Sequence, residues 1–260
     1  MKLPFWKLAG AGNDFILLEA SRLGGRSRPA LARRLCERRR SIGADGLLVV
    51  SRRPAGFDHY NADGSRAFCG NGARCAAVWM RTAGWIGRRA RLGSPAGTVE
   101  AELLGPRRAR VRMPAARRLR SLEFRVLGRT LRAVLYDTGV PHAVVRVRGL
   151  SRWPVYEIGR LLRGHPAFGR GGANVDFIET RGGTVFVRTY ERGVEDETLA
   201  CGTGAVAAAL EAREPGRRSP VRVAMPGGRL SVAFAGPGPR WEDVRLEGPA
   251  EIVFKGEVQP

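Results

Sequence analysis

The chain has 260 residues, enough for one large domain or two of about 130 residues each, and 43% of them are apolar, enough to form a core. No run approaches the roughly 20 apolar residues of a membrane span, no export signal is visible, and four cysteines are too few for a disulfide framework, which favours a cytoplasmic protein without a membrane partner. The net charge of +21 would suit a nucleic-acid binder, but only three of the 45 basic residues are lysines and the arginines are scattered without an aromatic platform, so we expect no specific nucleic-acid partner.

The first half is predicted to consist of strands and turns around two helices. Residues 5–18 indicate two strands joined by a Gly-rich turn, and residues 29–40 indicate a surface helix that starts at a proline. A buried strand at 47–50 and a short strand at 57–61 lead to a second helix over about 69–83. The later segments alternate apolar and polar residues, as antiparallel strands do, at 98–104, 108–113, 123–127 and 131–136.

A stretch of Pro, Ala and Arg at 114–118 is the best candidate for a linker between the halves. After it we expect a strand at 143–147, a helix over about 154–163 and, following an acidic turn, a helix over about 201–213. Further strands are expected at 174–180, at 184–190 and within the tail at 220–255.

Cys69 and Cys201 begin near-copies of one sequence, CGNGARCAA and CGTGAVAAA. Each thiol precedes a flexible Gly-x-Gly turn and a run of helix formers, so we expect each sulfur at a helix N-terminus, where free N–H groups and the helix dipole favour a thiolate. Two such thiols are what an enzyme needs to remove a proton from one face of a carbon and return it on the other. Cys36 and Cys75 lack this context and are expected to pack as small apolar residues.

The backbone beside these thiols has a predicted use of its own. The N–H groups of Gly70-Asn71 and Gly202-Thr203 would point from the helix N-termini toward a substrate carboxylate. There they would stabilise the negative charge that gathers during proton removal. Glycine allows the backbone to approach the substrate closely.

The two halves also match outside the cysteine motifs, since NDFI at 13–16 resembles NVDFI at 174–178. The two pairs of matching motifs are separated by different numbers of residues, which indicates an old duplication followed by changes in the loops. Because strands and helices rarely alternate, we expect an α+β fold of two pseudosymmetric halves, each a curved, mostly antiparallel sheet wrapped around its central cysteine helix. The N-terminal half would cover 1–115 with a C-terminal strand at about 249–260, and the C-terminal half would cover 116–248.

Seven motifs, taken in order, make the chain resemble the diaminopimelate epimerase family. They span nearly the whole chain and are GAGNDF (10–15), IGADG (42–46), NADGS (61–65), CGNGARC (69–75), GxPHAV (139–144), NVDF (174–177) and YERGVEDETLACGTGA (190–205). The resemblance implies an isomerase that converts LL-2,6-diaminopimelate to the meso isomer, a step toward lysine and peptidoglycan, without pyridoxal phosphate, any other cofactor or a metal. It also implies an active site in the cleft between the halves and a homodimer.

The resemblance assigns roles to further residues. It makes Cys69 and Cys201 the two catalytic bases, and it implies that His142 and Glu191 tune their protonation. Recognition of the distal end of the substrate is carried over to Asn13, Asn61, Asn174, Glu191 and Arg192. A guanidinium can bind a carboxylate bidentately, and asparagine offers both donors and acceptors.

Two positions depart from the family pattern. Val140 stands where many members have Asn, and Gly46 stands where some have Gln, so neither side chain can hydrogen-bond the distal group. This leaves a related cofactor-independent racemase or epimerase of another amino acid as the alternative. A basic binding protein on a retired enzyme scaffold is a second alternative, which the two thiols oppose because such a scaffold needs neither.

Overall fold

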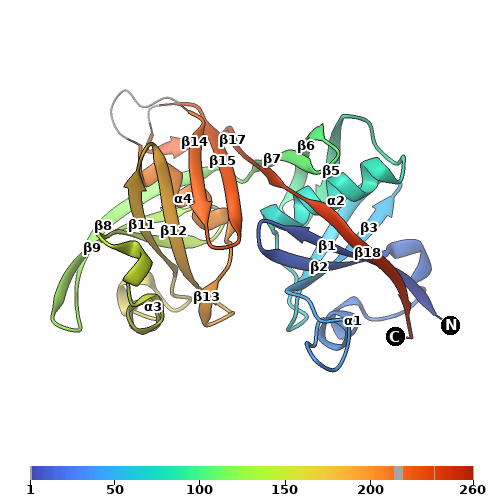
Figure 1. The fold of residues 1–260 in the computed structure, drawn as a ribbon, viewed down its shortest axis with the longest axis horizontal. Coiled ribbons are helices and arrows are strands. Elements are labelled where there is room, and N and C mark those ends of the chain that lie inside the picture. The colour runs from blue at the N-terminus through green and yellow to red at the C-terminus, as the bar shows by residue number, and fades with distance from the viewer. Residues whose placement is uncertain (1, 214–218, 237, 260) are drawn as a thin grey trace. The chain divides into compact units, whose positions relative to one another are not determined.

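The computed structural model describes residues 2–213, 219–236 and 238–259. The chain forms two compact units (Figure 1). Unit 1 contains the residues up to Arg112 together with those from Glu247 onward, and unit 2 contains Met113–Leu246. The C-terminal segment therefore returns to the N-terminal unit, and β17 (Val244–Pro249) carries the chain from unit 2 back to unit 1.

Unit 1 is a curved sheet that wraps around one buried helix, α2 (Gly70–Thr82). A shorter helix, α1 (Arg28–Leu35), packs on β3 and β4. In sheet order the strands are β18 (Glu251–Val258), β1 (Leu3–Gly10), β2 (Asn13–Glu19), β3 (Gly46–Arg52), β4 (Ala55–Asn61), β5 (Arg89–Ser94), β6 (Gly97–Gly105) and β7 (Arg108–Met113). The pairs β2–β3 and β4–β5 are parallel, and the other neighbours are antiparallel.

Unit 2 repeats this plan around α4 (Gly202–Glu211), with α3 (Val155–Arg163) on the opposite face of β12. Its strands are β8 (Ala116–Val126), β9 (Arg129–Asp137), β10 (Pro141–Arg146), β11 (Asn174–Arg181), β12 (Thr184–Glu191), β13 (Asp196–Thr198), β14 (Val221–Met225), β15 (Gly228–Phe234) and β16 (Arg240–Trp241). The short 3-10 helices of the two units are η1 (Ala20–Arg22), η2 (Leu150–Arg152) and η3 (Pro166–Phe168).

The duplication suggested by the sequence is visible in the pairing of the strands. In unit 1, β1 pairs antiparallel with β2, β2 pairs parallel with β3, and β4 pairs parallel with β5 across α2. In unit 2, β9 pairs antiparallel with β10, β10 parallel with β11, and β12 parallel with β14 across α4. The expected α+β fold of two similar halves, each wrapped around its cysteine helix, is therefore confirmed.

Small side chains explain why both cysteine helices can be enclosed by strands. Every residue of α2 from Gly70 to Met80 is buried, and so is α4 from Gly202 to Leu210 apart from Thr203. A helix buried on all sides must be narrow and mostly apolar, which the Ala and Gly residues provide, although α2 also buries Asn71 and Arg74. This burial fixes the N-terminus of each helix against its sheet.

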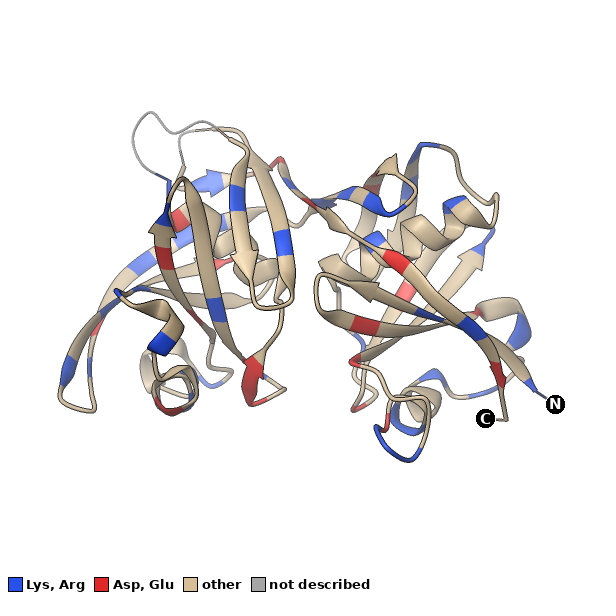
Figure 2. Cartoon of the chain, viewed as in Figure 1, with Lys and Arg blue, Asp and Glu red and all other residues tan. Residues whose placement is uncertain are grey.

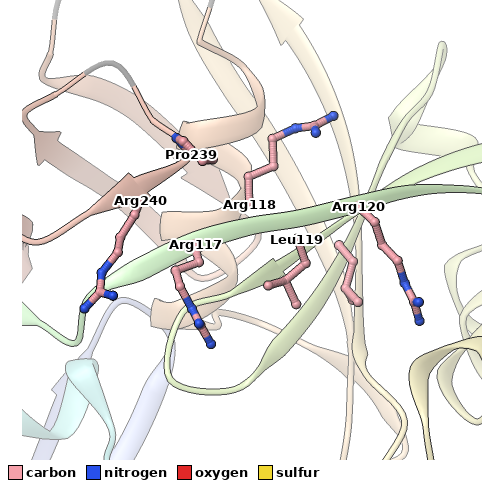
Figure 3. A pocket seen from close by; sticks show the side chains of 7 residues that line it. Arg117, Arg118, Leu119, Arg120, Pro239 and Arg240 are labelled. Atoms are coloured by element: carbon pink, nitrogen blue, oxygen red, sulfur yellow. The ribbon is translucent and has the colours of Figure 1, made fainter.

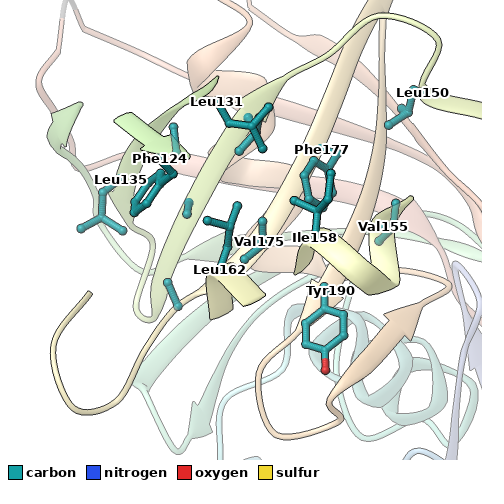
Figure 4. Close-up of a cluster of buried hydrophobic side chains, with 14 residues drawn as sticks. Phe124, Leu131, Leu135, Leu150, Val155, Ile158, Leu162, Val175, Phe177 and Tyr190 are labelled. Atoms are coloured by element: carbon teal, nitrogen blue, oxygen red, sulfur yellow. The ribbon is translucent and has the colours of Figure 1, made fainter. Parts of the chain in front are cut away.

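A hydrophobic core of unit 2 lies between α3 and the strands β8 to β12 (Figure 4). Val155, Ile158 and Leu162 of α3 belong to this core, and Ile158 lies beside Phe177 of β11. Gly159 allows this approach, because a Cβ there would lie 2.7 Å from Cγ of Tyr190. Burial of such side chains contributes about 1.5–3 kcal/mol each.

Some element boundaries differ from expectation. The helix expected over 29–40 ends at Leu35, where Cys36 is its C-cap. The strand expected at 123–127 is the end of β8, which starts at Ala116 and so occupies most of the expected linker. Seven of the eleven residues of β8 are exposed, so the strand lacks the alternation that would have shown it.

Charged residues are distributed over both units, with basic and acidic side chains interspersed (Figure 2). Several arginines form ion pairs within one sheet, such as Arg110 with Glu102 and Glu247, and Arg188 with Glu197. Among the described residues, none of the helices has both the length and the apolar character that crossing a bilayer requires.

Candidate active site

Cys69 is the N-cap of α2. Its backbone is extended (φ −132°, ψ 116°), and its sulfur accepts the N–H of Gly72 at 3.4 Å. The residue is partly exposed. The predicted geometry is thus found: the thiol sits at the positive end of a buried helix, where free N–H groups face it.

Cys201 is the N-cap of α4, with nearly the same backbone conformation (φ −124°, ψ 113°). It is more enclosed than Cys69, with 6% of its surface exposed. Burial, and then the negative charges of Glu191 and Asp176, raise the pKa of its thiol well above the usual value. The two thiols therefore share a backbone setting but differ in their side-chain surroundings.

The other two cysteines are unsuited to acid–base work at neutral pH. Cys36 and Cys75 are both buried, and burial raises the pKa of each thiol to about 12. Neither is the N-cap of a helix, because Cys36 is the C-cap of α1 and Cys75 lies inside α2. Both fit the packing role expected from the sequence.

In unit 1 a chain of hydrogen bonds joins the side chains of Arg74, Asn71, Asn13 and Asp45. Arg74 donates to Oδ1 of Asn71 at 2.8 Å, and Asn71 donates to Oδ1 of Asn13 at 2.5 Å. Asn13 in turn donates to Asp45 at 3.0 Å. The structure thus brings together the predicted residues Asn13 and Asn71, and it aligns both amides through Arg74 and Asp45.

Asn61 ends β4, and its side chain is tied to the following turn by a 2.9 Å bond to Oγ of Ser65. The same strand carries His59, which explains Gly46 on the neighbouring β3. A Cβ at position 46 would lie 2.5 Å from Nε2 of His59. The imidazole is buried, and this burial lowers its pKa to about 4, so it is neutral at pH 7.

A second network lies in unit 2 and reaches Cys201. Nδ1 of His142 is 2.7 Å from Asp176, and Nε2 of His142 is 2.9 Å from Oγ1 of Thr203. That hydroxyl is 3.4 Å from the sulfur of Cys201. Thr189 donates to the other oxygen of Asp176 at 2.7 Å. His142 and Asp176 are fully enclosed, so the network contains a buried imidazole and a buried carboxylate.

The side-chain amide of Asn174 lies against Nε2 of His142. The backbone N–H of Arg192 donates to its Oδ1 at 2.8 Å, so Nδ2 is the end that faces Pro141 O at 3.2 Å and Nε2 of His142 at 3.3 Å. Nε2 of His142 thus faces both the amide of Asn174 and the hydroxyl of Thr203, while Nδ1 faces Asp176. The register of β10 and β11, which pairs His142 with Asn174, creates this contact.

Glu191, the last residue of β12, and Arg192, which follows it, are held by contacts with neighbouring segments. Glu191 accepts a 2.7 Å hydrogen bond from Thr198 on the paired strand β13. The guanidinium of Arg192 lies 3.4 Å from the carbonyl oxygen of Gly171. The negative charge of Glu191 contributes to the raised pKa of the Cys201 thiol.

A hollow of about 440 Å³ in unit 2 contains none of the predicted site residues (Figure 3). It is lined by Arg117, Arg118, Leu119, Arg120, Leu135, Pro239 and Arg240. The labelled arginines point in different directions, and Arg117 and Arg240 form ion pairs with Asp137 and Glu242. These side chains do not converge on a common ligand position.

The family model described as diaminopimelate epimerase matches residues 5–119 and 134–253, which include both cysteine motifs. The chain belongs to the diaminopimelate epimerase family. A diaminopimelate epimerase of Aquifex aeolicus is 34% identical over 98% of both chains. One of Methanothrix thermoacetophila is 39% identical over 99% of this chain and 96% of its own. The protein is therefore an isomerase.

Solved structures with low sequence identity share the fold. A phenazine biosynthesis protein of the PhzF family from Bacillus anthracis superposes with a TM-score of 0.79 at 14% identity and covers 100% of both chains. Identity this low carries the fold alone. The fold of this chain is thus shared by proteins outside the diaminopimelate epimerases, such as this PhzF-family protein.

Sequence reasoning missed three residues of this candidate site. Asp176 was noticed only as part of the repeated NVDF motif, although a carboxylate in an otherwise apolar strand is itself a signal of a buried partner. Arg74 stands among small residues that predict a buried helix, so its charge must be buried together with that helix. His59 could not be found, because its contact with Gly46 depends on the pairing of β3 and β4.

Proposed function

We propose that this protein converts LL-2,6-diaminopimelate to the meso isomer without a cofactor, with Cys69 and Cys201 as two bases at one α-carbon. The observation that carries the proposal is the matched setting of the two thiols. Each is the N-cap of a buried helix with the same extended backbone, one in each of two duplicated units. The proposed substrate follows from membership in the family, and the matched thiols support the two-base mechanism.

The proposed reaction moves two protons. A thiolate takes the α-proton, and the electron pair left on the carbon is delocalised into the neighbouring carboxylate. The opposite thiol gives its proton to the other face of the carbon. The α-carbon is thereby inverted, and each cysteine ends with the protonation state that the other had at the start.

The backbone lowers the barrier to this reaction. The transition state gathers negative charge on the substrate carboxylate, and the N–H groups of Gly70-Asn71 and Gly202-Thr203 lie at helix N-termini. Donors held in advance at such a position stabilise developing charge, and loss of one donor typically costs about 100- to 1000-fold in rate. We assign both pairs to the reacting carboxylate.

The remaining predicted residues are assigned to recognition of the distal amino-acid end. Arg192 would bind the distal carboxylate, and Glu191 the distal ammonium group. Asn13, Asn61 and Asn174 already bond to protein groups through one or both ends of their amides. Their role is therefore to present fixed hydrogen-bonding groups at low entropic cost.

The test is to incubate the protein with LL-diaminopimelate in D₂O, without added cofactor, and to follow the α-protons by NMR. Deuterium at one α-carbon together with the meso isomer is the expected result. Cys69→Ser and Cys201→Ser should each abolish isomer formation. Near-normal turnover by either variant would contradict the two-base mechanism.

Gly46 and Val140 favour one alternative substrate class. Neither residue offers a side-chain hydrogen bond, so the distal end of the substrate has fewer polar partners than the family pattern provides. A cofactor-independent racemase of another amino acid is the alternative, and failure to exchange the α-proton of diaminopimelate by reduced, folded protein would support it. A homodimer, a cytoplasmic location and a place in lysine and peptidoglycan synthesis belong to the same proposal.

A further inference from the structure

We infer that His59 is a substrate-binding residue, which forms with Asn61 a site for an ammonium group of the distal amino-acid end. This inference deepens the proposed function, on which the identity of the ligand rests. It follows from the position of Gly46, which leaves room for a ligand beside Nε2 of a buried imidazole.

His59 lies on the face of the sheet that packs against α2. In the register of β3 and β4, Leu48 is opposite His59 and Gly46 is opposite Asn61. Residues that are opposite each other, or two apart on one strand, share a face of the sheet. A Cβ at Gly72 of α2 would lie 3.0 Å from the side chain of Leu48, so this shared face is the one that meets the first turn of the cysteine helix.

The backbone determines which nitrogen of His59 carries the proton. Nδ1 lies 3.2 Å from the carbonyl oxygen of Ala67, two residues before Cys69. A carbonyl oxygen only accepts, so we assign the ring proton to Nδ1. Burial lowers the pKa of the imidazole to about 4, so the ring is neutral at pH 7. Nε2 therefore has a free lone pair and is a hydrogen-bond acceptor.

The absence of a side chain at Gly46 keeps this acceptor open. A Cβ there would lie 2.5 Å from Nε2 of His59 and 2.9 Å from the carbonyl oxygen of Tyr60. The φ of Gly46 is not positive, so glycine is required for space and not for backbone conformation. Among the described residues, Nε2 has no hydrogen-bond partner. An acceptor in so enclosed a place calls for a partner, which a ligand can provide.

Asn61 presents a second acceptor on the same face. Its Nδ2 donates to Oγ of Ser65 at 2.9 Å. The hydroxyl hydrogen of Ser65 goes to the carboxylate of Asp63 at 2.6 Å, so the hydroxyl oxygen can only accept from Asn61. The amide is thereby fixed in one orientation, and the end left for a ligand is the acceptor Oδ1.

Two acceptors beside Gly46 determine the charge of the group that fits there. An ammonium group carries three N–H donors and no acceptor, so it can bond to both His59 and Asn61 and still donate to Glu191. A carboxylate would meet two lone pairs and be repelled. His59 thus supplies from β4 the polar partner that Gly46 cannot supply from β3, and it selects substrates with a distal ammonium group.

Long-range ¹H–¹⁵N NMR of the full chain tests the contact directly. The chain has three histidines, so the Nε2 signal of His59 can be assigned by its absence in His59→Gln. LL-2,6-diaminopimelate should shift this signal upfield, because an unprotonated ring nitrogen moves in that direction when it accepts a hydrogen bond. The compound 2-aminopimelate lacks the distal ammonium group and should leave the signal in place. A signal that diaminopimelate leaves unmoved, or that both compounds shift equally, would overturn the inference.

Variants separate binding from packing. His59→Asn keeps a donor for the carbonyl oxygen of Ala67 but removes the acceptor at Nε2. KM for diaminopimelate should therefore rise about tenfold or more with little change in kcat, since a hydrogen bond to a charged group is lost. His59→Gln places an amide oxygen near the position of Nε2 and should restore most of the affinity. Phe57→Leu is the matched control, because Phe57 is buried on the same strand and the same face. An equal rise of KM in His59→Asn and Phe57→Leu would assign the effect to packing.

This inference and the proposed function can fail separately. Epimerisation in D₂O reports on the proposed function, whereas the Nε2 signal reports on the ammonium site. Protein that epimerises diaminopimelate while the signal stays unmoved would contradict the inference alone. A signal that moves in protein unable to epimerise diaminopimelate would contradict the proposed function alone.

Discussion

At the scale of single residues, Thr203 is the link between Cys201 and the buried groups of unit 2. Its hydroxyl lies between the sulfur and Nε2 of His142, and its backbone N–H belongs to the first turn of α4. The side chain and the backbone of this residue therefore have separable roles. A substitution that removes only the hydroxyl tests the first without disturbing the second.

Thr203→Val keeps the shape and the N–H group and removes the hydroxyl. We expect kcat for epimerisation to fall by about tenfold or more, with little change in KM, because a positioned proton-transfer partner contributes about 10²- to 10⁴-fold. The matched control is Thr138→Val, whose hydroxyl donates to the carbonyl oxygen of Thr203 at 3.3 Å. Equal effects of the two substitutions would show that the hydroxyl of Thr203 acts only through packing.

His59 predicts how stability depends on pH. Burial lowers its pKa from 6.5 to about 4, so the unfolded chain binds more protons than the folded one between these values. The free energy of unfolding should therefore be fully maintained above pH 6.5 and fall by up to about 3 kcal/mol as the pH drops to 4. Urea unfolding at several pH values measures this, and His59→Gln should flatten that part of the curve. An unchanged slope in the variant would assign the loss to other groups.

At the scale of elements, α3 illustrates how tightly a helix is fitted to its sheet. Gly159 faces Tyr190 of β12, and Val155, Ile158 and Leu162 fill the space beside it. The conformation of Gly159 does not itself require glycine, because its φ is not positive. The requirement comes from the close approach of the helix to the strand.

Gly159→Ala should destabilise the protein by about 1–3 kcal/mol, because the added methyl group overpacks the contact with Tyr190. Gly164→Ala, just beyond the same helix, is the control, since no atom lies within 4 Å of a Cβ built there. Chemical denaturation of both variants measures the difference. A loss in Gly159→Ala no larger than in Gly164→Ala would show that α3 can move away from β12 at no cost.

The elements also show what the sequence could predict. The helices were located because Gly-x-Gly turns and Ala runs are local signals, and α2 and α3 were found to within a residue or two. The start of β8 was missed because its first residues are mostly arginine and exposed. Cys69 and Cys201 could be identified from a repeated motif. The contact of His142 with Asp176 could not, because it depends on the parallel pairing of β10 with β11.

At the scale of the whole molecule, the two units differ in how the chain builds them. Unit 2 is one continuous segment, Met113–Leu246, whereas unit 1 needs the C-terminal strand β18. That strand pairs with β1 over seven residue pairs, from Leu3 with Val258 to Ala9 with Glu251. Unit 1 therefore cannot close its sheet without the last residues of the chain.

A chain ended after Leu246 should retain unit 2 and lose unit 1. Removal of β18 leaves β1 as an open edge and exposes α2, which contacts β18 in the intact unit. Amide hydrogen exchange should show protection in β9 to β12 close to that of the full chain and little protection in β1 to β4. Loss of protection in both units would show that they fold as one cooperative body.

Because β18 returns to unit 1, it also affects when each unit can fold during synthesis of the chain. Synthesis runs from the N-terminus, and domains made first generally fold first. Here the first strands of unit 1 must wait for Glu251–Val258, which is made after all of unit 2. Unit 2 needs no residue beyond Leu246. Cys69 and its helix therefore reach their final setting only after unit 2 has been synthesised, so a nascent chain carries one reactive thiol that is not yet enclosed.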